Sequence, residues 1–236
     1  MDERLAPEIV AELLALIAHD LRNPLSALRS NLGFVGSVVE PANRDASDAV
    51  ADAMVSCDGL AQIIDNVEVM IFALKRQPAP ELGAVVLSHA VAQSVEGCRS
   101  TAQSHGVTLE IEPSANADVA VRSYQDLFVR ALGNLIRNSI QHGAGSKVRV
   151  STRCDGKTAS VRVSDGGEPL DVTQNPSPFT PAGQLSAKHT HSGRYGRGLG
   201  LWCASVAATA AGAKLKSLAG SSAEERNVFE LELGVL

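Results

Sequence analysis

Apolar residues recur every three or four positions over the first forty residues, and this spacing restricts the fold more than any other feature of the chain. It predicts a long helix, over residues 4–39, with one buried stripe. A second run with the same periodicity covers residues 46–75, and the turn residues of Glu40-Pro41-Ala42-Asn43 separate the two. The stripe of the first helix consists of Ile9, Leu13, Ile17, Leu21, Leu25, Leu28, Leu32 and Val35.

Two long helices joined by a short turn predict an antiparallel hairpin. Each helix has one apolar face and little else to bury it against, so we expect two copies to associate as a homodimeric four-helix bundle. Gln77-Pro78-Ala79-Pro80 is the proline-dense segment of the chain. We therefore expect a hairpin domain at 1–77, a linker at 78–80 and a second domain at 81–236.

The second domain mixes strand-like alternation with helical periodicity, which predicts an α+β chain. We expect this domain to be an α/β sandwich of one sheet and about three helices. The segment 166–198 is rich in Gly, Pro, Ser, Thr and His, and a loop of that length is uncommon unless it is functional or disordered. The expected strands are 84–87, 107–111, 119–122, 147–152, 159–164, 213–218 and 227–233, and the expected helices are 88–106, 124–142 and 199–211.

The first helix also carries a polar group of residues away from its apolar stripe. His19 is turned about 200° from both Ile17 and Leu21, and Asn23 lies one turn further on the same face. Asp20 is the next residue round the helix. A surface histidine on an amphipathic helix is the simplest interpretation, but Pro24 argues against it. A proline inside a helix costs about 3 kcal/mol, and positions that break such rules tend to be functional.

Three stretches of the second domain carry polar residues or glycines in patterns that suit a binding site. Asn134, Asn138 and His142 lie on one face of a predicted helix, although asparagine is a poor helix former. These residues are either ordinary surface polar residues or part of a metal-binding site. An asparagine carbonyl is a suitable ligand for Mg²⁺. Asp165-Gly166-Gly167 follows a predicted strand, where such a tripeptide is usually only a turn.

The third stretch is Gly196-Arg197-Gly198-Leu199-Gly200-Leu201, which opens a predicted helix. Its alternate glycines free backbone N–H groups to face an anion, and the helix dipole adds to this. A dinucleotide-type fingerprint or a flexible loop is the alternative. The loop before it holds no acidic residue after Asp171 but several cationic or titratable ones, Lys188, His189, His191, Arg194 and Arg197.

In this order the stretches resemble the sequence boxes of sensor histidine kinases. Residues 16–25 resemble the H-box, whose histidine is phosphorylated, and residues 132–142 resemble the N-box. Residues 163–170 resemble the G1 box, residues 196–201 the G2 box, and Phe179 the apolar anchor of the F-box. The resemblance implies a dimeric helical hairpin followed by a Bergerat-type ATP-binding domain of the GHKL superfamily.

The resemblance also implies that ATP and Mg²⁺ bind the second domain. Asn138 would coordinate Mg²⁺, Asn134 and Gln141 would approach the phosphates, and Asp165 would accept a hydrogen bond from the adenine amino group. Gly167 would give the backbone room to approach the base. Three positions depart from the family pattern: Gln141 stands where lysine is commoner, His142 where an aromatic residue is commoner, and Pro169 where a second glycine is common.

The glycine-rich loop would close over the triphosphate, and we expect Arg194 and Arg197 to be its γ-phosphate ligands. The loop contributes Gly196, Gly198, Leu199, Gly200 and Leu201 to the expected site.

In such an enzyme the neutral imidazole of His19 is the nucleophile, and Asp20 holds or accepts its other ring proton. Phosphoryl transfer to an aspartate of a response regulator would follow. Asn23 matches the family position that orients water for dephosphorylation of the regulator, and a plain helix-surface asparagine is an equal alternative. Two other classes stay open: a phosphotransfer or scaffold protein with a degenerate nucleotide domain, and a superfamily ATPase or serine kinase without phosphohistidine.

Bulk composition bounds the partners and the compartment. A net charge of -5 and an aromatic content of 3% do not favour nucleic acid. Cys57, Cys98, Cys154 and Cys203 lack metal-ligand spacing, and we interpret them as reduced thiols of a cytoplasmic protein. No apolar run approaches the roughly 18 residues of a membrane span. His19 is too near Met1 for a preceding sensory domain, so we expect the sensor to be a separate protein or this chain to be part of a longer one.

Overall fold

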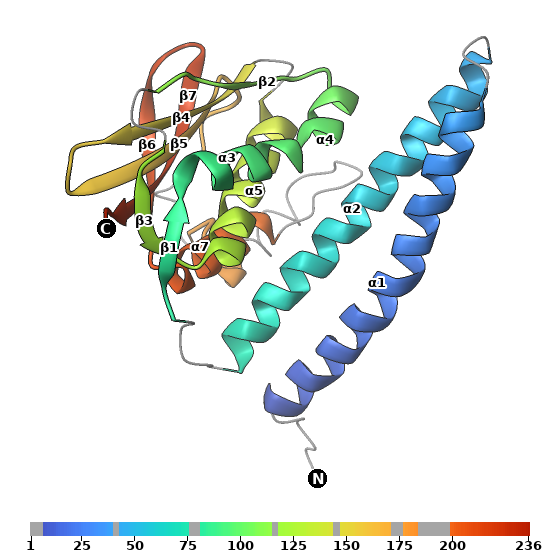
Figure 1. Cartoon of the computed structure of the whole chain (residues 1–236), viewed down its shortest axis with the longest axis horizontal. Coiled ribbons are helices and arrows are strands. Elements are labelled where there is room, and N and C mark those ends of the chain that lie inside the picture. The colour runs from blue at the N-terminus through green and yellow to red at the C-terminus, as the bar shows by residue number, and fades with distance from the viewer. Residues whose placement is uncertain are drawn as a thin grey trace. The chain divides into compact units, whose positions relative to one another are not determined.

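A computed structural model describes residues 7–39, 43–75, 81–114, 118–143, 147–170, 177–183 and 199–236. The chain divides into two compact units, Met1–Gln77 and Pro78–Leu236 (Figure 1). The expected linker, 78–80, lies outside the described residues. No described helix is both long enough and apolar enough to cross a membrane.

The first unit is a hairpin of two long helices, α1 (Pro7–Val38) and α2 (Arg44–Leu74). The helix α1 continues through Pro24. The helix α2 begins slightly earlier than predicted because Asn43 caps it: the side-chain carbonyl accepts a hydrogen bond from the backbone N–H of Ala46 at 3.2 Å. The predicted helical hairpin is therefore confirmed.

The two helices meet through a narrow core of buried residues. Ala18 and Leu25 of α1 pack with Cys57 and Ile64 of α2, and Leu32, Ala61 and Val67 pack against this cluster. Ion pairs flank it, from Arg22 to Asp65 at 3.2 Å and to Glu68 at 2.6 Å, and from Arg29 to Asp58 at 3.1 Å. A small residue at position 18 lets the helices approach closely, which selects this face of α1 as the contact face.

The predicted buried stripe of α1 is wrong for the single chain. Leu25 is buried and Leu32 is partly buried, whereas the other members are between 41% and 54% exposed. The physical reason is that α2 packs on the face of Ala18 and Leu25, and Ile17 lies about 100° round the helix from Ala18. The exposed apolar face, called the α1 stripe below, consists of Ile9, Leu13, Ile17, Leu21, Leu28 and Val35.

The second unit contains a five-stranded sheet in the order β2-β4-β5-β7-β6. The strand β2 runs parallel to β4, and the other neighbours are antiparallel. The strands are β2 (Thr108–Ile111), β4 (Lys147–Cys154), β5 (Thr158–Asp165), β6 (Lys214–Ser222) and β7 (Glu225–Gly234).

The prediction of a single sheet is wrong, because β1 (Gly83–Val86) and β3 (Ala120–Ser123) pair with each other in a separate antiparallel ribbon. The ribbon meets the chain end after β7 through one isolated bridge, between Val121 and Val235. Alternation in the sequence identifies a strand but not its partner. These short strands pair with each other, and Ala120 also accepts a hydrogen bond from the backbone N–H of Leu236 at 3.0 Å.

The helices of this unit are α3 (Leu87–Glu96), α4 (Arg99–Ser104), α5 (Gln125–His142) and α7 (Gly200–Ala210). The predicted single helix over 88–106 is two helices, broken at Gly97 and Cys98, because glycine is a weak helix former. Gly106 follows α4 with a φ of 63°, a left-handed conformation that ends a helix.

The main core lies between the sheet and α5, which packs on β4, β5 and β7 and also against α7. Alternate residues of the central strands face it, so their patterns of burial alternate. The fully buried side chains include Phe128, Leu132, Leu135, Ile136, Val148, Val150, Val161, Val163, Phe229 and Leu231. The thiols of Cys98 and Cys203 are also buried in this unit, and burial raises the pKa of Cys203 to about 12. The thiol of Cys57 is buried in the core of the hairpin.

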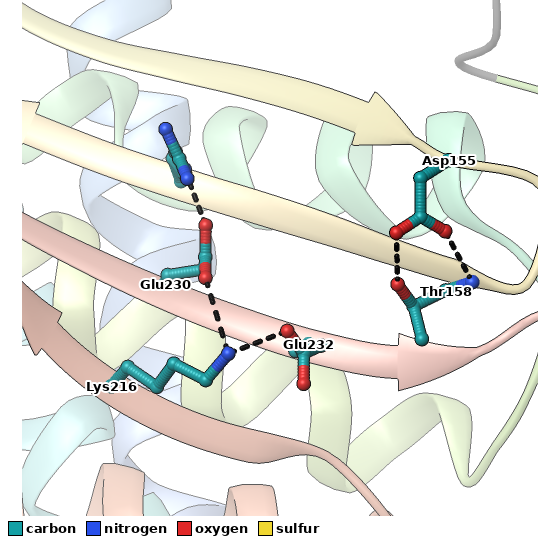
Figure 2. A network of polar contacts seen from close by, with 6 residues as sticks. Asp155, Thr158, Lys216, Glu230 and Glu232 are labelled. Atoms are coloured by element: carbon teal, nitrogen blue, oxygen red, sulfur yellow. Dashed lines mark hydrogen bonds and ion pairs between the residues drawn. The ribbon is translucent and has the colours of Figure 1, made fainter.

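Charged residues on the sheet form a ladder across three strands (Figure 2). Glu230 of β7 is 5% exposed and pairs with Arg162 of β5 and, at 3.7 Å, with Lys216 of β6. Lys216 also binds Glu232 at 2.5 Å, and this hydrogen bond raises the pKa of Lys216. At the turn before β5, Asp155 accepts hydrogen bonds from Thr158, which hold the pKa of its carboxyl below the usual range. These contacts fix the register of the strands.

We predict that Leu231→Ala lowers the free energy of unfolding of the second unit by about 2–5 kcal/mol, because it opens a cavity in the core. Leu218→Ala, on the neighbouring strand at a position that is 38% exposed, should cost less than about 1 kcal/mol. Urea unfolding followed by circular dichroism measures both. Equal losses for the two variants would contradict the placement of the core.

Candidate functional site

His19 and Asp20 form an exposed pair on α1. Their side chains are 73% and 78% exposed, and Nδ1 of His19 lies 3.2 Å from Oδ1 of Asp20. Asp20 can therefore hold a proton on Nδ1, which leaves the lone pair of Nε2 directed to solvent. Asn23 is exposed one turn further along the helix. The three predicted residues thus share a polar surface of the first unit, and their chemical roles stay predictions.

The polar face of α5 passes from the interior to the surface. Asn134 is 5% exposed, Asn138 and Gln141 are half-buried, and His142 is exposed. A Cβ on Gly200 would lie 4.0 Å from Oδ1 of Asn134, so the start of α7 lies beside this face. The fold therefore brings the predicted N-box and the described end of the G2 box together.

Asp165 is the last residue of β5 and is 1% exposed. Its Oδ1 accepts a hydrogen bond from the backbone N–H of Gly167 at 2.9 Å and another from Nδ2 of Asn227 at 2.8 Å. Within the described part of the chain, the other carboxylate oxygen, Oδ2, has no hydrogen-bond donor. A buried carboxylate with one oxygen left over is suited to a ligand that brings a donor.

Gly167 lies against the end of α5. A Cβ at this position would be 2.1 Å from the backbone oxygen of His142 and 2.8 Å from its carbonyl carbon. Glycine is therefore required at position 167 because the turn after β5 lies so close to the last residue of α5. Room for a base at Gly167 stays a prediction.

The helix α7 begins with Leu199 as its N-cap residue, and the leucine side chain makes no capping hydrogen bond. The first backbone N–H groups of a helix are the groups that bind an anion at its start. Leu199 and Gly200 are half-buried and Leu201 is 5% exposed. The remaining predicted residues of this loop, Arg194, Gly196, Arg197 and Gly198, lie outside the described residues.

Phe179 follows the turn after β5 in the chain, and its ring meets that of Phe229 on β7. The ring centroids are 6.4 Å apart at an interplanar angle of 80°, an edge-to-face contact. Phe179 therefore anchors its segment on the sheet, as expected of an apolar anchor.

Sequence reasoning missed Asn227, whose side chain joins the site from β7. It is 7% exposed and lies directly opposite Asp165 in the register of β5 and β7. Asparagine is depleted in strands, and this one occupies a buried position. That conflict with strand propensity is the signal that could have identified it.

The donor set fits Mg²⁺ held mainly by a nucleotide. Among the described residues there is no cluster of three or more His, Cys, Asp or Glu side chains that could bind a metal. Asn138 is half-buried, and within the same residues its carboxamide has no hydrogen-bond partner. Mg²⁺ keeps several waters and takes few protein ligands together with phosphate oxygens. One carboxamide oxygen is therefore sufficient on the protein side.

Comparison with known proteins identifies the relatives of this architecture. Residues 123–234 match the family of histidine kinase-, DNA gyrase B- and HSP90-like ATPases. Sporulation kinase B of Bacillus subtilis (strain 168) is 26% identical over 162 residues, which cover 67% of this chain. The match spans 36% of that protein, little more than a third of its length.

Solved histidine kinases share the fold. Full-length ShkA, in complex with AMPPNP, has a TM-score of 0.55 at 19% identity over 95% of this chain and 46% of its own. The histidine kinase AdeS of Acinetobacter baumannii has a TM-score of 0.54 at 14% identity over 92% of this chain and 97% of its own. The predicted fold class, a helical hairpin followed by an α/β sandwich domain, is confirmed.

We predict that Gly167→Ala greatly weakens nucleotide binding and lowers the melting temperature, because a methyl group cannot occupy space 2.1 Å from the His142 oxygen. Gly83→Ala is the matched control, since a Cβ there meets nothing within 4 Å. Calorimetric titration with ADP and a thermal melt measure the two effects. Wild-type behaviour of Gly167→Ala would contradict the close approach of the turn to α5.

Proposed function

We propose, from the match of residues 123–234 to the family of histidine kinase-, DNA gyrase B- and HSP90-like ATPases, that this chain is a protein histidine kinase. In this proposal it phosphorylates itself on His19 with ATP and passes the phosphoryl group to an aspartate of a response regulator. The carrying observation is the exposed His19–Asp20 pair on a helical hairpin that precedes an ATPase domain.

The adenine end of ATP would bind at Asp165. Its Oδ2 would accept a hydrogen bond from the adenine amino group, since Oδ1 already accepts from Gly167 and Asn227. The adjoining wall is the end of α5, held against the turn by the absence of a side chain at Gly167. Discrimination for adenine would follow, because guanine presents a carbonyl oxygen at the same position and would repel the carboxylate.

The phosphates would lie between the polar face of α5 and the start of α7. Asn138 would hold Mg²⁺, with Asn134, Gln141 and His142 on the same helix, and the first backbone N–H groups of α7 would bind phosphate oxygens. When bound, the metal supplies neutralisation of phosphate charge. Arg194 and Arg197 stay our proposed γ-phosphate ligands, together with the backbone of Gly196, Gly198 and Gly200.

Phosphoryl transfer is in-line and depends mainly on positioning and charge. The Nε2 lone pair of neutral His19 attacks the γ-phosphorus, the bond from that phosphorus to the β,γ-bridging oxygen breaks, and ADP leaves. The imidazole thereby gains a positive charge, which the Asp20 carboxylate stabilises by holding or accepting the Nδ1 proton. Attack by an aspartate of the response regulator then regenerates His19, and Asn23 would orient water for later hydrolysis of the aspartyl phosphate.

The α1 stripe supports a homodimer. Its members are large apolar residues that α2 leaves exposed, and such a contiguous face usually marks an interaction site. A second hairpin would bury it as a four-helix bundle. A cytoplasmic location completes the proposal.

We predict that labelled ATP with Mg²⁺ transfers its γ-phosphate to the wild-type chain, and that the product is acid-labile and alkali-stable as phosphohistidine is. His19→Ala should abolish labelling, and Asn138→Ala should reduce it by at least about a hundredfold, since loss of a residue that merely supports a metal ligand already costs about 10–100-fold. His105→Ala, which changes an exposed histidine of the second unit, should label normally. Nucleotide binding without labelling would favour the scaffold alternative, and acid-stable label would favour a serine kinase.

We also predict that the double variant Ile17→Glu/Leu28→Glu is a monomer, because it places charges in the α1 stripe. Ser26→Glu/Ser30→Glu adds the same charge on the opposite side of α1 and should leave the dimer intact. Sedimentation velocity at micromolar concentration distinguishes the two. A dimer that survives the stripe substitutions would show that another surface holds the copies together.

A further inference from the structure

We propose that Asn227 is a positioning residue of the nucleotide site. Its carboxamide orients Asp165 and also holds the turn at residues 168–170, so that the adenine end of the site is formed before nucleotide binds. The inference rests on the proposed function, in which Asp165 binds adenine, and extends it to a residue on a different strand.

The geometry engages both the Nδ2 group and the carbonyl oxygen of one side chain. The Nδ2 group donates to Oδ1 of Asp165 at 2.8 Å and to the backbone oxygen of Glu168 at 3.0 Å. The Oδ1 atom accepts from the backbone N–H of Leu170 at 2.7 Å. The carboxamide supplies two N–H hydrogens and a carbonyl oxygen, so both kinds of group are engaged.

This pattern explains why the residue is asparagine. The donors and the acceptor sit on defined partners, so rotating the amide by 180° would place its oxygen against two other oxygens. Aspartate would bring a second carboxylate to 2.8 Å from Asp165. Serine and threonine offer a single donor hydrogen and cannot bind Asp165 and Glu168 at once. No other side chain of this length can make all three contacts.

The contacts on either side of Pro169 hold the turn itself. Before the proline, the backbone oxygen of Glu168 accepts a hydrogen bond from Nδ2 of Asn227. After the proline, the backbone N–H of Leu170 donates to Oδ1 of Asn227. Proline fixes its own φ near −65° and has no N–H to satisfy. One side chain therefore closes the turn around a residue that is already rigid, at a position where the resembled family often has glycine.

Preorganisation is the functional consequence. Asn227 uses Oδ1 of Asp165 and leaves Oδ2 for the base, so the carboxylate does not have to reorient when nucleotide arrives. A site that is ordered before binding loses less conformational entropy on binding. Two residues further along β7, Phe229 packs on Phe179, so the same face of this strand holds the segment at a second point.

The test is a double-mutant cycle on the full chain, read by calorimetric titration with ADP and Mg²⁺. Asn227→Ala should weaken ADP binding about tenfold, the size expected for loss of a hydrogen bond to a charged group. In an Asp165→Asn background, the same substitution should add much less than in the wild type, because Asn227 acts through Asp165. Asn227→Asp, which keeps the size, should weaken binding at least as much as Asn227→Ala.

The control is Val228→Ala, the neighbouring residue of β7 whose side chain points to the other side of the sheet. It should bind ADP as the wild type does. Binding by Asn227→Ala equal to that of Val228→Ala, or effects of Asn227→Ala and Asp165→Asn that simply add, would overturn the proposal.

A second readout is independent of nucleotide. Hydrogen exchange of the Leu170 amide in the nucleotide-free chain should accelerate in Asn227→Ala and not in Val228→Ala. An unchanged exchange rate in Asn227→Ala would overturn the proposal that Asn227 holds the turn, even where ADP affinity falls. If the wild type binds no ADP, the proposed function fails and the adenine role fails with it, while the exchange of Leu170 still reports whether Asn227 holds the turn.

Discussion

The end of β5 meets the end of α5 at a distance that permits only glycine, and the candidate site depends on this contact. Gly167 brings the turn after β5 against the backbone oxygen of His142, and Asp165, two residues earlier, is buried and fixed by β7. This contact fixes the position of α5, which carries Asn134 and Asn138, relative to the end of β5, which carries Asp165. A ligand that contacts both must match the spacing between them, as a nucleotide with a base at one end and phosphates at the other can.

Local signals in the sequence predict most of the elements but not how their faces are used. Helical periodicity identifies α1 and α2, yet the interhelical contact runs through Ala18 and Leu25, while the α1 stripe stays exposed. Large apolar residues indicate burial somewhere, and only the small size of Ala18 indicates where a neighbouring helix can come close. The same limit applies to β1 and β3, because alternation does not reveal a strand's partner.

The candidate site shows a similar division. Motif order predicts Asp165, Asn138 and the glycine at position 167 because those residues lie in compact, recognisable stretches. Asn227 belongs to no motif, since its role comes from the pairing register of β5 with β7 across a separation of about sixty residues. What the sequence does contain is a conflict: a polar, poor strand-forming residue in a buried strand position. Such conflicts are expected at sites where function overrides local preference.

The burial of the proposed groups follows the chemistry that each must perform. A carboxylate that selects a base by one hydrogen bond discriminates best where water is excluded, because an unpaired polar group is costly there. Asp165 is accordingly 1% exposed and partly satisfied by the protein itself. A histidine that must meet first a nucleotide and then a partner protein has the opposite requirement, and the His19 side chain is 73% exposed. Among the described residues the adjacent acid, Asp20, is the group placed to assist it, so in the proposed reaction the orientation of the incoming phosphate, rather than burial of the imidazole, would supply the reactivity. In the proposed reaction the positioning falls on the second unit, where Asp165 is buried and held by Gly167 and Asn227.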